Sequence, residues 1–221
     1  MLARRPQTWW QGSHRRHQPR GLCSLLQASS NLFSPVHSLP EDVDPDSGLC
    51  GEGLVKIAES KGKGLGAFSV RGFDAGCVLP GEYRGELLTL NTLHMRYGDS
   101  DPIGGDAAWE QQRCEWRRQW MQERQQRGVG VSGRYCFKFG LHPNLGTVVV
   151  LDAEDPDHAN WTRFLNHSSA DPNLTVQKSV NACGHPMIHF AARCDIAPAA
   201  ELLFDYGPAY GRHFGVEQQD T

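Results

Sequence analysis

The sequence predicts an α+β domain that is mostly β-structure, built from small sheets with one inserted helical segment. After Leu54, most of the chain falls into short apolar runs bounded by glycine and proline, a pattern typical of strands joined by tight turns. In contrast, the stretch Asp106–Arg127 contains no glycine or proline and carries large apolar residues at helical spacing. Small sheets interrupted by one helix define a β-rich α+β architecture.

Strands are expected at the short apolar runs that turn-forming residues bound. In chain order these are Leu54–Ser60, Gly64–Val70, Cys77–Leu88, Arg134–Phe139, Thr147–Ala153, Leu174–Val180, Met187–Arg193 and Ala200–Tyr206. The helical insert is expected at about residues 91–133, inside the domain rather than at one of its ends.

The expected helix has one face that repeats along its length. This face consists of Trp109, Arg113, Trp116 and Trp120. Charged residues and glutamines fill the other positions, and Gly128 follows as a stop signal. The tryptophan stripe favours packing against the domain. The alternative is that its outer end forms a wall of a peptide groove, since tryptophan offers a large apolar surface.

Residues 1–48 differ in composition from the rest and are expected to be a disordered basic tail with a linker. Residues 1–40 contain no acidic residue and are rich in arginine and serine. This composition is typical of mitochondrial and plastid transit peptides. Two other interpretations stay open, an ordinary disordered tail and a weak basic nuclear signal at Arg15-Arg16.

The Pro-, Asp-, Ser- and Gly-rich stretch Pro40–Gly48 is interpreted as the linker. The domain is then expected to span residues 50–215, followed by a short C-terminal tail at residues 216–221. A transit peptide would place the protein in a plastid or mitochondrion. Either of the other interpretations would place it in the nucleus or the cytoplasm.

Composition excludes several classes of function. No apolar run approaches the length of a membrane span, and the net charge of −3 gives no overall attraction to nucleic acid. The seven cysteines are scattered without metal-ligand spacing, so no zinc site and no disulfide framework are expected. We therefore expect that the protein binds neither membranes nor nucleic acid, and we also expect a monomer.

Two segments near the C-terminus carry the strongest functional signal. RFLNHSSADPNL at Arg163–Leu174 joins Arg, Asn and His in a strand-to-turn passage, and ELLFDYG at Glu201–Gly207 ends a short strand on Asp205 and Tyr206. In this order the pair resembles the two signature motifs of the SET-domain family, the protein lysine methyltransferases that use S-adenosylmethionine. The resemblance implies the SET (β-clip) fold, in which the second segment threads under the first in a knot-like crossing.

Further segments resemble the cofactor site of the family. ESKGKGLGAFSV at Glu59–Val70 is similar to its Gly-x-Gly loop, whose backbone meets the methionine part of the cofactor. Glycine suits such a loop because it permits positive φ and close approach. On this resemblance the cofactor S-adenosyl-L-methionine is held by Gly62, Lys63, Gly64, Arg163, Phe164, Asn166, His167 and Tyr206.

The resemblance also implies a catalytic tyrosine and an aromatic lysine channel. Tyr206 is the catalytic tyrosine, assisted by Tyr135 in RYCFKF and Tyr83 in GEYRGELL. The channel residues are Phe204, Tyr135, Tyr210 and Phe214. An aromatic channel removes water from the target ammonium, which lowers the pKa of the lysine, and favours methylated cations by cation–π contact.

The predicted function is therefore S-adenosylmethionine-dependent methylation of a lysine in a protein or peptide. Many chromatin-directed members carry zinc-binding cysteine clusters and a cysteine after Asn-His-Ser, where this chain has Ser169. The target is left open between histone methylation in chromatin and a non-histone lysine. Phe204 implies methylation beyond the first methyl group, because phenylalanine lacks the hydroxyl that holds a water against the amine. The alternative function is an inactive SET-like protein-interaction module.

Overall fold

The computed structural model describes residues 39–98 and 107–207, and of residues 107–109 only the backbone. The basic tail predicted at the N-terminus lies outside the described residues, apart from its linker. Tyr210 and Phe214, which we expected in the lysine channel, also lie outside them. Among the described helices, none is long and apolar enough to cross a membrane.

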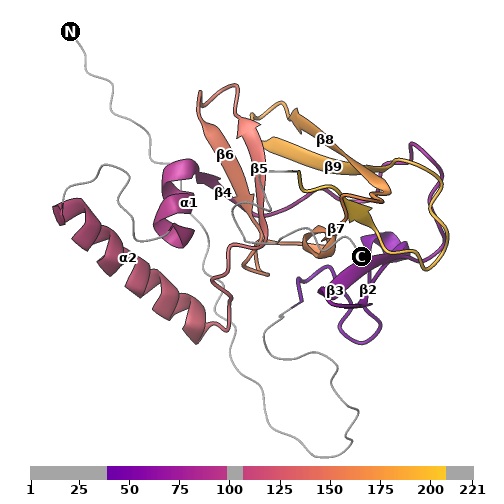
Figure 1. The fold of residues 1–221 in the computed structure, drawn as a ribbon, viewed down its shortest axis with the longest axis horizontal. Coiled ribbons are helices and arrows are strands. Elements are labelled where there is room, and N and C mark those ends of the chain that lie inside the picture. Colours follow the sequence, from indigo (N-terminus) through magenta and orange to yellow (C-terminus); the bar gives the residue numbers. More distant parts are fainter. Residues whose placement is uncertain (1–38, 99–106, 208–221) are drawn as a thin grey trace, which may run out of the picture. The chain divides into compact units, whose positions relative to one another are not determined.

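The described residues form four small sheets, as the sequence predicted for a mostly-β domain (Figure 1). Their strands are β1 (Leu49–Cys50), β2 (Val55–Ser60), β3 (Gly64–Ser69), β4 (Glu86–Thr89), β5 (Cys136–Leu141), β6 (Val148–Asp152), β7 (Asn166–His167), β8 (Leu174–Val180), β9 (Pro186–Ala192) and β10 (Leu203–Phe204). The sheets have the orders β1-β2-β3, β4-β6-β5, β8-β9 and β10-β7. The pair of β7 and β10 is parallel, and the pairs in the other sheets are antiparallel.

The described part of the insert contains two α-helices rather than a single one, α1 (Leu90–Tyr97) and α2 (Ala107–Gln126). Thr89 caps α1, because its hydroxyl accepts a hydrogen bond from the backbone N–H of Thr92 at 3.2 Å. The prediction of α2 is confirmed. We did not predict α1 separately, because a helix of eight residues gives little periodic signal. A short 3₁₀ turn, η1 (Gly51–Gly53), follows β1, and a second one, η2 (Trp161–Phe164), precedes β7.

Two tryptophans of the α2 stripe, Trp116 and Trp120, pack against each other and against α1, as expected for a packing face, and the side chain of Trp109 lies outside the described residues. Trp116 and Trp120 stack with ring centroids 6.1 Å apart, and Trp120 meets the ring of Tyr97 edge-on at 5.4 Å. The guanidinium groups of Arg96 and Arg124 lie 5.6 and 4.8 Å from the Trp120 ring. These contacts cover the cations with an aromatic surface, which is favourable when they are shielded from water.

Buried ion pairs fasten the insert to the sheet β4-β6-β5. Arg96 pairs with Glu86 of β4 and with Asp152 of β6, both at 2.7 Å. Arg124 of α2 pairs with Glu86 at 2.8 Å, and the Tyr97 hydroxyl donates to Asp152 at 2.8 Å. Burying charges is costly unless each finds several partners, and this network supplies them. The two helices are thereby held in a fixed position beside the strands.

Two expected strands are shorter in the structure, and the expected linker is folded. Of Cys77–Leu88 only β4 and an isolated bridge at Val78 form, since Pro80 lacks a donor N–H and glycines follow it. Ala200–Tyr206 is a strand only at β10. The segment Pro40–Gly48 is not a free linker, because Val43 lies in the core and Asp42 accepts a hydrogen bond from the Trp161 backbone N–H at 3.1 Å.

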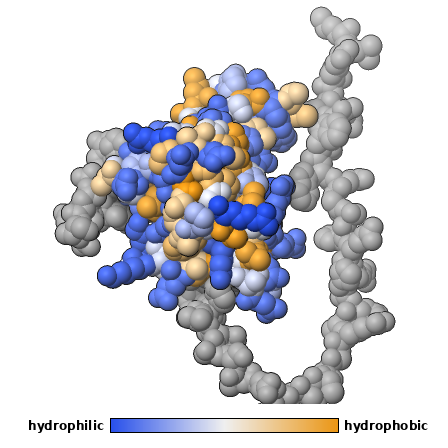
Figure 2. All heavy atoms as spheres, turned by 90° about the vertical axis from the view of Figure 1, so that its right-hand side faces the viewer, coloured by the Kyte–Doolittle hydropathy of each residue, from blue (hydrophilic) through white to orange (hydrophobic). Residues whose placement is uncertain are grey.

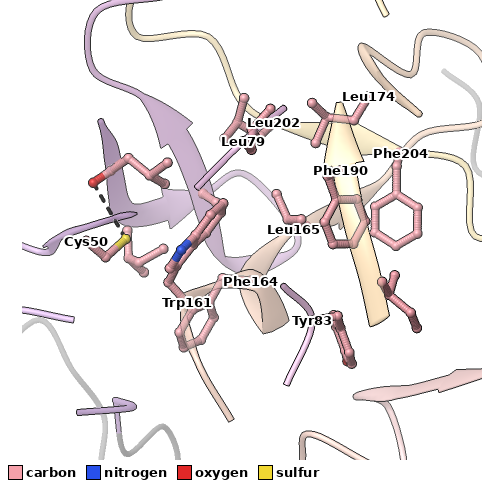
Figure 3. Close-up of a cluster of buried hydrophobic side chains, with 14 of the residues drawn as sticks. Cys50, Leu79, Tyr83, Trp161, Phe164, Leu165, Leu174, Phe190, Leu202 and Phe204 are labelled. Carbon is pink, nitrogen blue, oxygen red and sulfur yellow. Dashed lines mark hydrogen bonds between the residues drawn. The ribbon is translucent and has the colours of Figure 1, made fainter. Parts of the chain in front are cut away.

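One hydrophobic core lies beneath the sheets (Figure 3). The rings of Phe190 and Phe204 lie side by side, with centroids 5.0 Å apart, and Trp161 lies near Cys50. On the face shown in Figure 2, hydrophobic side chains are interrupted by hydrophilic ones, so no single apolar patch covers that face.

The strand β10 runs through a loop of the chain. Successive residues of a strand direct their backbone groups to opposite edges. The carbonyl oxygen of Phe204 accepts a hydrogen bond from Ser168, next to β7, at 3.2 Å. At the other edge, Leu203 accepts from the Asn173 backbone N–H at 3.0 Å and donates to the Asn173 side chain at 2.8 Å. The loop of residues 168–173 therefore encloses β10, which is the knot-like crossing expected from the sequence.

Candidate active site

An aromatic cavity of about 460 Å³ lies between the insert, β5, β8 and β10. It brings together five of the residues predicted for the site, although they are far apart in the sequence: Tyr83, Tyr135, Arg163, Phe204 and Tyr206. Leu90 and Leu93 of α1 add an apolar wall, and Phe137 of β5 adds another ring. A concave site with apolar walls and a few polar groups is typical of ligand-binding sites.

Tyr206 lies where the cavity meets the Asn-His segment. Its hydroxyl donates a hydrogen bond to the Leu165 carbonyl oxygen at 2.6 Å, and its backbone N–H donates to Nδ1 of His167 at 3.1 Å. Its ring centroid is 4.6 Å from that of Phe204 and 5.1 Å from that of His167. The phenol is therefore fixed in orientation by contacts on both sides.

Tyr83 and Tyr135 form a second fixed pair in the cavity wall. The Tyr83 hydroxyl donates to the Tyr135 carbonyl oxygen at 2.6 Å. Burial raises the pKa of Tyr83 well above its ordinary value, so this phenol stays protonated and keeps its donor. The pair ties the segment before β4 to the start of β5.

Arg163 faces the cavity and is 8% exposed. Its guanidinium lies 3.9 Å from the ring of Tyr135 and 5.5 Å from that of Phe164. Within the described part of the chain, its Nε and Nη1 atoms have no hydrogen-bond partner. The aromatic faces therefore supply the main compensation for this buried charge.

On the other side of Tyr206, three of the predicted segments are joined. The Asn166 side-chain amide donates to the Leu65 carbonyl at 3.1 Å and to Oε1 of Glu201 at 2.8 Å. The Lys63 ammonium donates to the His167 carbonyl at 2.9 Å. The glycine loop, the Asn-His segment and the last motif thus form one hydrogen-bonded unit.

The glycines of the loop have two different physical roles. Gly62 and Gly64 have φ values of +75° and +79°, and a Cβ at either would meet no atom within 4 Å. Their backbone therefore faces open space. At Gly66, a Cβ would lie 2.6 Å from Oε1 of Glu201 and 2.9 Å from Nδ2 of Asn166. Gly66 is needed because other groups approach its backbone closely.

The structure places two predicted cofactor residues away from the loop. The Phe164 side chain is 3% exposed and belongs to the core, and Arg163 faces the aromatic cavity. Neighbouring residues of the 3₁₀ turn η2 point in different directions, which separates the two side chains. Gly62, Lys63 and Gly64 form the loop, Asn166 and His167 contact it, and none of these five residues lines the cavity.

Four residues of the candidate site were not identified from the sequence. Glu201 and Gly66 lie inside segments that we had matched to the family, so their positions were visible but their contacts were not. The Leu165 contribution is a backbone carbonyl, which no sequence pattern reveals. Lys178 lies on β8, and only the fold brings it to the cavity. In the described ranges, no group of three or more His, Cys, Asp or Glu side chains is arranged to hold a metal ion.

A family model described as the SET domain matches residues 64–207, more than half of the chain. The chain therefore belongs to the SET-domain family, a family of the lysine methyltransferase type. The crystal structure of CpSET8 from Cryptosporidium is a similar solved structure, with 21% sequence identity and a TM-score of 0.45. The match covers 69% of this chain and 57% of that chain, so this protein spans little more than half of the other's length. No curated protein matches the sequence significantly.

Proposed function

We propose that this protein is an S-adenosylmethionine-dependent protein-lysine N-methyltransferase. The observation that carries the proposal is the position of Tyr206, which belongs to the aromatic cavity and also contacts His167. Methyl transfer to an amine is an in-line displacement, so the amine site and the cofactor site must meet at one point. In this fold the two candidate sites meet at Tyr206.

The residues beside the glycine loop fit the polar parts of S-adenosylmethionine. Open space adjoins the backbone of Gly62 and Gly64, and the Asn166 side chain and the His167 backbone carbonyl lie next to this loop, while the His167 ring lies against Tyr206. Backbone N–H groups, an amide and an imidazole are suitable donors and acceptors for an amino acid and a nucleoside. When bound, S-adenosylmethionine would supply an electrophilic methyl group.

The chain's own groups can then orient a target amine. Because the Tyr206 hydroxyl donates its proton to the Leu165 carbonyl, its oxygen acts as an acceptor toward other groups. A neutral lysine amine can donate an N–H to this oxygen and keep its own lone pair free for the displacement. Because Tyr206 is fixed before the amine arrives, no reorganisation is needed at the moment of reaction.

The cavity also favours a neutral amine, and Lys178 gives a local indication of this. Desolvation lowers the pKa of the Lys178 ammonium, and the nearby charge of Lys138 lowers it further. A target lysine entering deeper between the rings would experience the same two effects. A lower pKa raises the fraction of nucleophilic amine at neutral pH.

Calorimetric titration of S-adenosylmethionine into the full-length protein tests the cofactor site first. We expect micromolar binding, and we expect Asn166→Ala to weaken it by at least about tenfold, since a lost hydrogen bond is worth about 1 kcal/mol and the loop also loses its anchor. Gln177→Ala is the matched control, because it removes an amide from an exposed position of β8 that does not line the cavity.

Methyl transfer is tested next with tritiated S-adenosylmethionine on a peptide array that presents lysines in varied sequence contexts. Label on lysine, lost in Tyr206→Phe, would support the enzyme. Cofactor binding without any transfer would favour the inactive interaction module, and absence of cofactor binding would overturn the proposal.

A further inference from the structure

The charged residues that line the aromatic cavity are almost all basic. Beside Arg163 in the wall, the positive residues are Arg134, Lys138 and Lys178. Among the described residues that line the cavity, Asp205 is the one acidic residue. Its carboxylate accepts a hydrogen bond from the Gly207 backbone N–H at 2.7 Å and lies 3.9 Å from His167, so it is already engaged within its own turn.

The nearby acidic residues of the sheet β4-β6-β5 do not offset this charge. Glu86 and Asp152 are both paired with Arg96 at 2.7 Å, and Glu86 is also paired with Arg124. The two carboxylates and the two guanidinium groups of this network balance each other in charge. The cavity therefore keeps an excess of positive charge, although the whole chain has a net charge of −3.

Lys178 and Lys138 place this charge at the edge of the cavity. The Lys178 ammonium donates to the carbonyls of Lys138 and Phe139 at 2.7 and 3.1 Å and lies 5.2 Å from the ring of Phe137. These contacts hold the Lys178 head between β5 and β8. The Lys138 side chain is exposed on β5. Both positive groups thus belong to the lining of the cavity that a target lysine would enter.

We propose that the substrate is a lysine flanked by acidic residues, rather than a lysine in a basic segment. The proposal rests on the proposed methyltransferase function and names its substrate class. Flanking carboxylates would complement Lys138 and Lys178, whereas flanking lysines or arginines would meet like charges close together. An acidic peptide also fits better than a nucleic acid, since the positive groups gather at one aromatic cavity and, among the residues that line it, do not form an extended stripe.

Fluorescence anisotropy with labelled peptides tests this preference directly on the full-length chain. Three peptides carry a central lysine flanked by glutamate, by serine or by arginine, and a labelled single-stranded oligonucleotide serves as a fourth probe. We expect the glutamate peptide to bind at least about tenfold more tightly than the arginine peptide at low salt, and the difference to shrink as salt screens it.

Charge variants connect the preference to the cavity. Lys138→Glu should reverse the preference between glutamate and arginine peptides, and Lys178→Gln should reduce it. Lys56→Glu is the matched control, because Lys56 is exposed on β2 and does not line the cavity. Circular dichroism checks that each variant remains folded. If Lys138→Glu unfolds, Lys178→Gln still tests the proposal, because glutamine keeps a hydrogen-bond donor at this position.

The possible outcomes separate this proposal from the proposed function. Tighter binding of the arginine peptide, equal or absent binding of all peptides, or tighter binding of the oligonucleotide would overturn the acidic preference. An equal shift of the peptide preference in the Lys56→Glu control would also overturn it. If acidic peptides bind as expected but calorimetry shows no binding of S-adenosylmethionine, the enzyme proposal fails while the preference of the surface stands.

Discussion

The Tyr206 hydroxyl donates a hydrogen bond to the Leu165 carbonyl at 2.6 Å, and this bond joins the last motif of the chain to the residue before Asn166. The backbone N–H of the same tyrosine donates to His167. The enclosed strand β10 holds both contacts in place, because its edges are paired with β7 and with Asn173. The geometry of the candidate site is thus set by the crossing itself.

Tyr206→Phe should lower methyl transfer by about a hundredfold or more, because it removes one preorganised polar group. The affinity for S-adenosylmethionine should change little, since the ring and the backbone contact to His167 remain. Stability should fall by about 1–3 kcal/mol, as the Leu165 carbonyl loses its partner. Tritium transfer, calorimetry and thermal unfolding measure the three quantities. Full activity in the variant would show that the catalytic assignment is wrong.

Phe204→Tyr should restrict the product to fewer methyl groups. The Phe204 ring lines the cavity and packs against Phe137, Phe190 and Tyr206, with centroids 5.7, 5.0 and 4.6 Å away, so we expect an added hydroxyl to reach the cavity. The hydroxyl would hold a water and occupy the space that a further methyl group needs. Mass spectrometry of the product counts the methyl groups. An unchanged distribution of methylation states would contradict this prediction.

Gly66→Ala should destabilise the protein by about 1–3 kcal/mol, because the new methyl group overpacks a closely packed site. It would displace Glu201 or the Asn166 amide and should also weaken cofactor binding. Gly62→Ala is the comparison, since its Cβ meets no atom within 4 Å and only the positive φ opposes the change, at about 1 kcal/mol. Denaturant unfolding of both variants measures which of them loses more stability. Equal losses would show that the close contact at Gly66 has no energetic consequence.

Acid should destabilise the attachment of the insert. Burial by itself would raise the pKa of Glu86, but Arg96 and Arg124 outweigh it and hold the pKa below its ordinary value. A carboxyl group whose pKa is lower in the folded protein than in the unfolded chain stabilises the folded state. This stabilisation is complete above the pKa of the carboxyl in the unfolded chain, about 4.3, and is lost as the pH falls through its pKa in the folded protein. The free energy of unfolding should therefore decline below about pH 4.

Glu86→Gln isolates this contribution. The variant should be about 3 kcal/mol less stable at neutral pH, because two largely buried arginines lose a charged partner. The difference from the unchanged protein should shrink as the pH falls. Denaturant unfolding across the acid range measures it, with Glu123→Gln on the exposed face of α2 as control. A difference that is independent of pH would contradict the electrostatic origin.

Much of the fold followed from local patterns. The hairpin β2-β3, the strands β6, β8 and β9 and the helix α2 appear where alternation, turn residues and helical spacing predicted them. The errors in the predicted secondary structure lie in segments whose conformation is determined by long-range contacts. The segment Cys77–Leu88 was expected to be one strand but forms only β4 and a bridge. Pro40–Gly48 has the composition of a linker. It is folded because Asp42 accepts a hydrogen bond from Trp161 and Val43 is buried in the core.

The sequence by itself determined the family, the order of the motifs and the residue types of the candidate site, because these reside in short contiguous segments such as Asn166-His167 and Phe204–Tyr206. The tertiary structure alone decided that Arg163 faces the cavity, that Glu201 holds Asn166, and that Lys178 brings positive charge to the rim. Each of these depends on contacts between residues distant along the chain. A local sequence pattern contains no information about such a long-range contact.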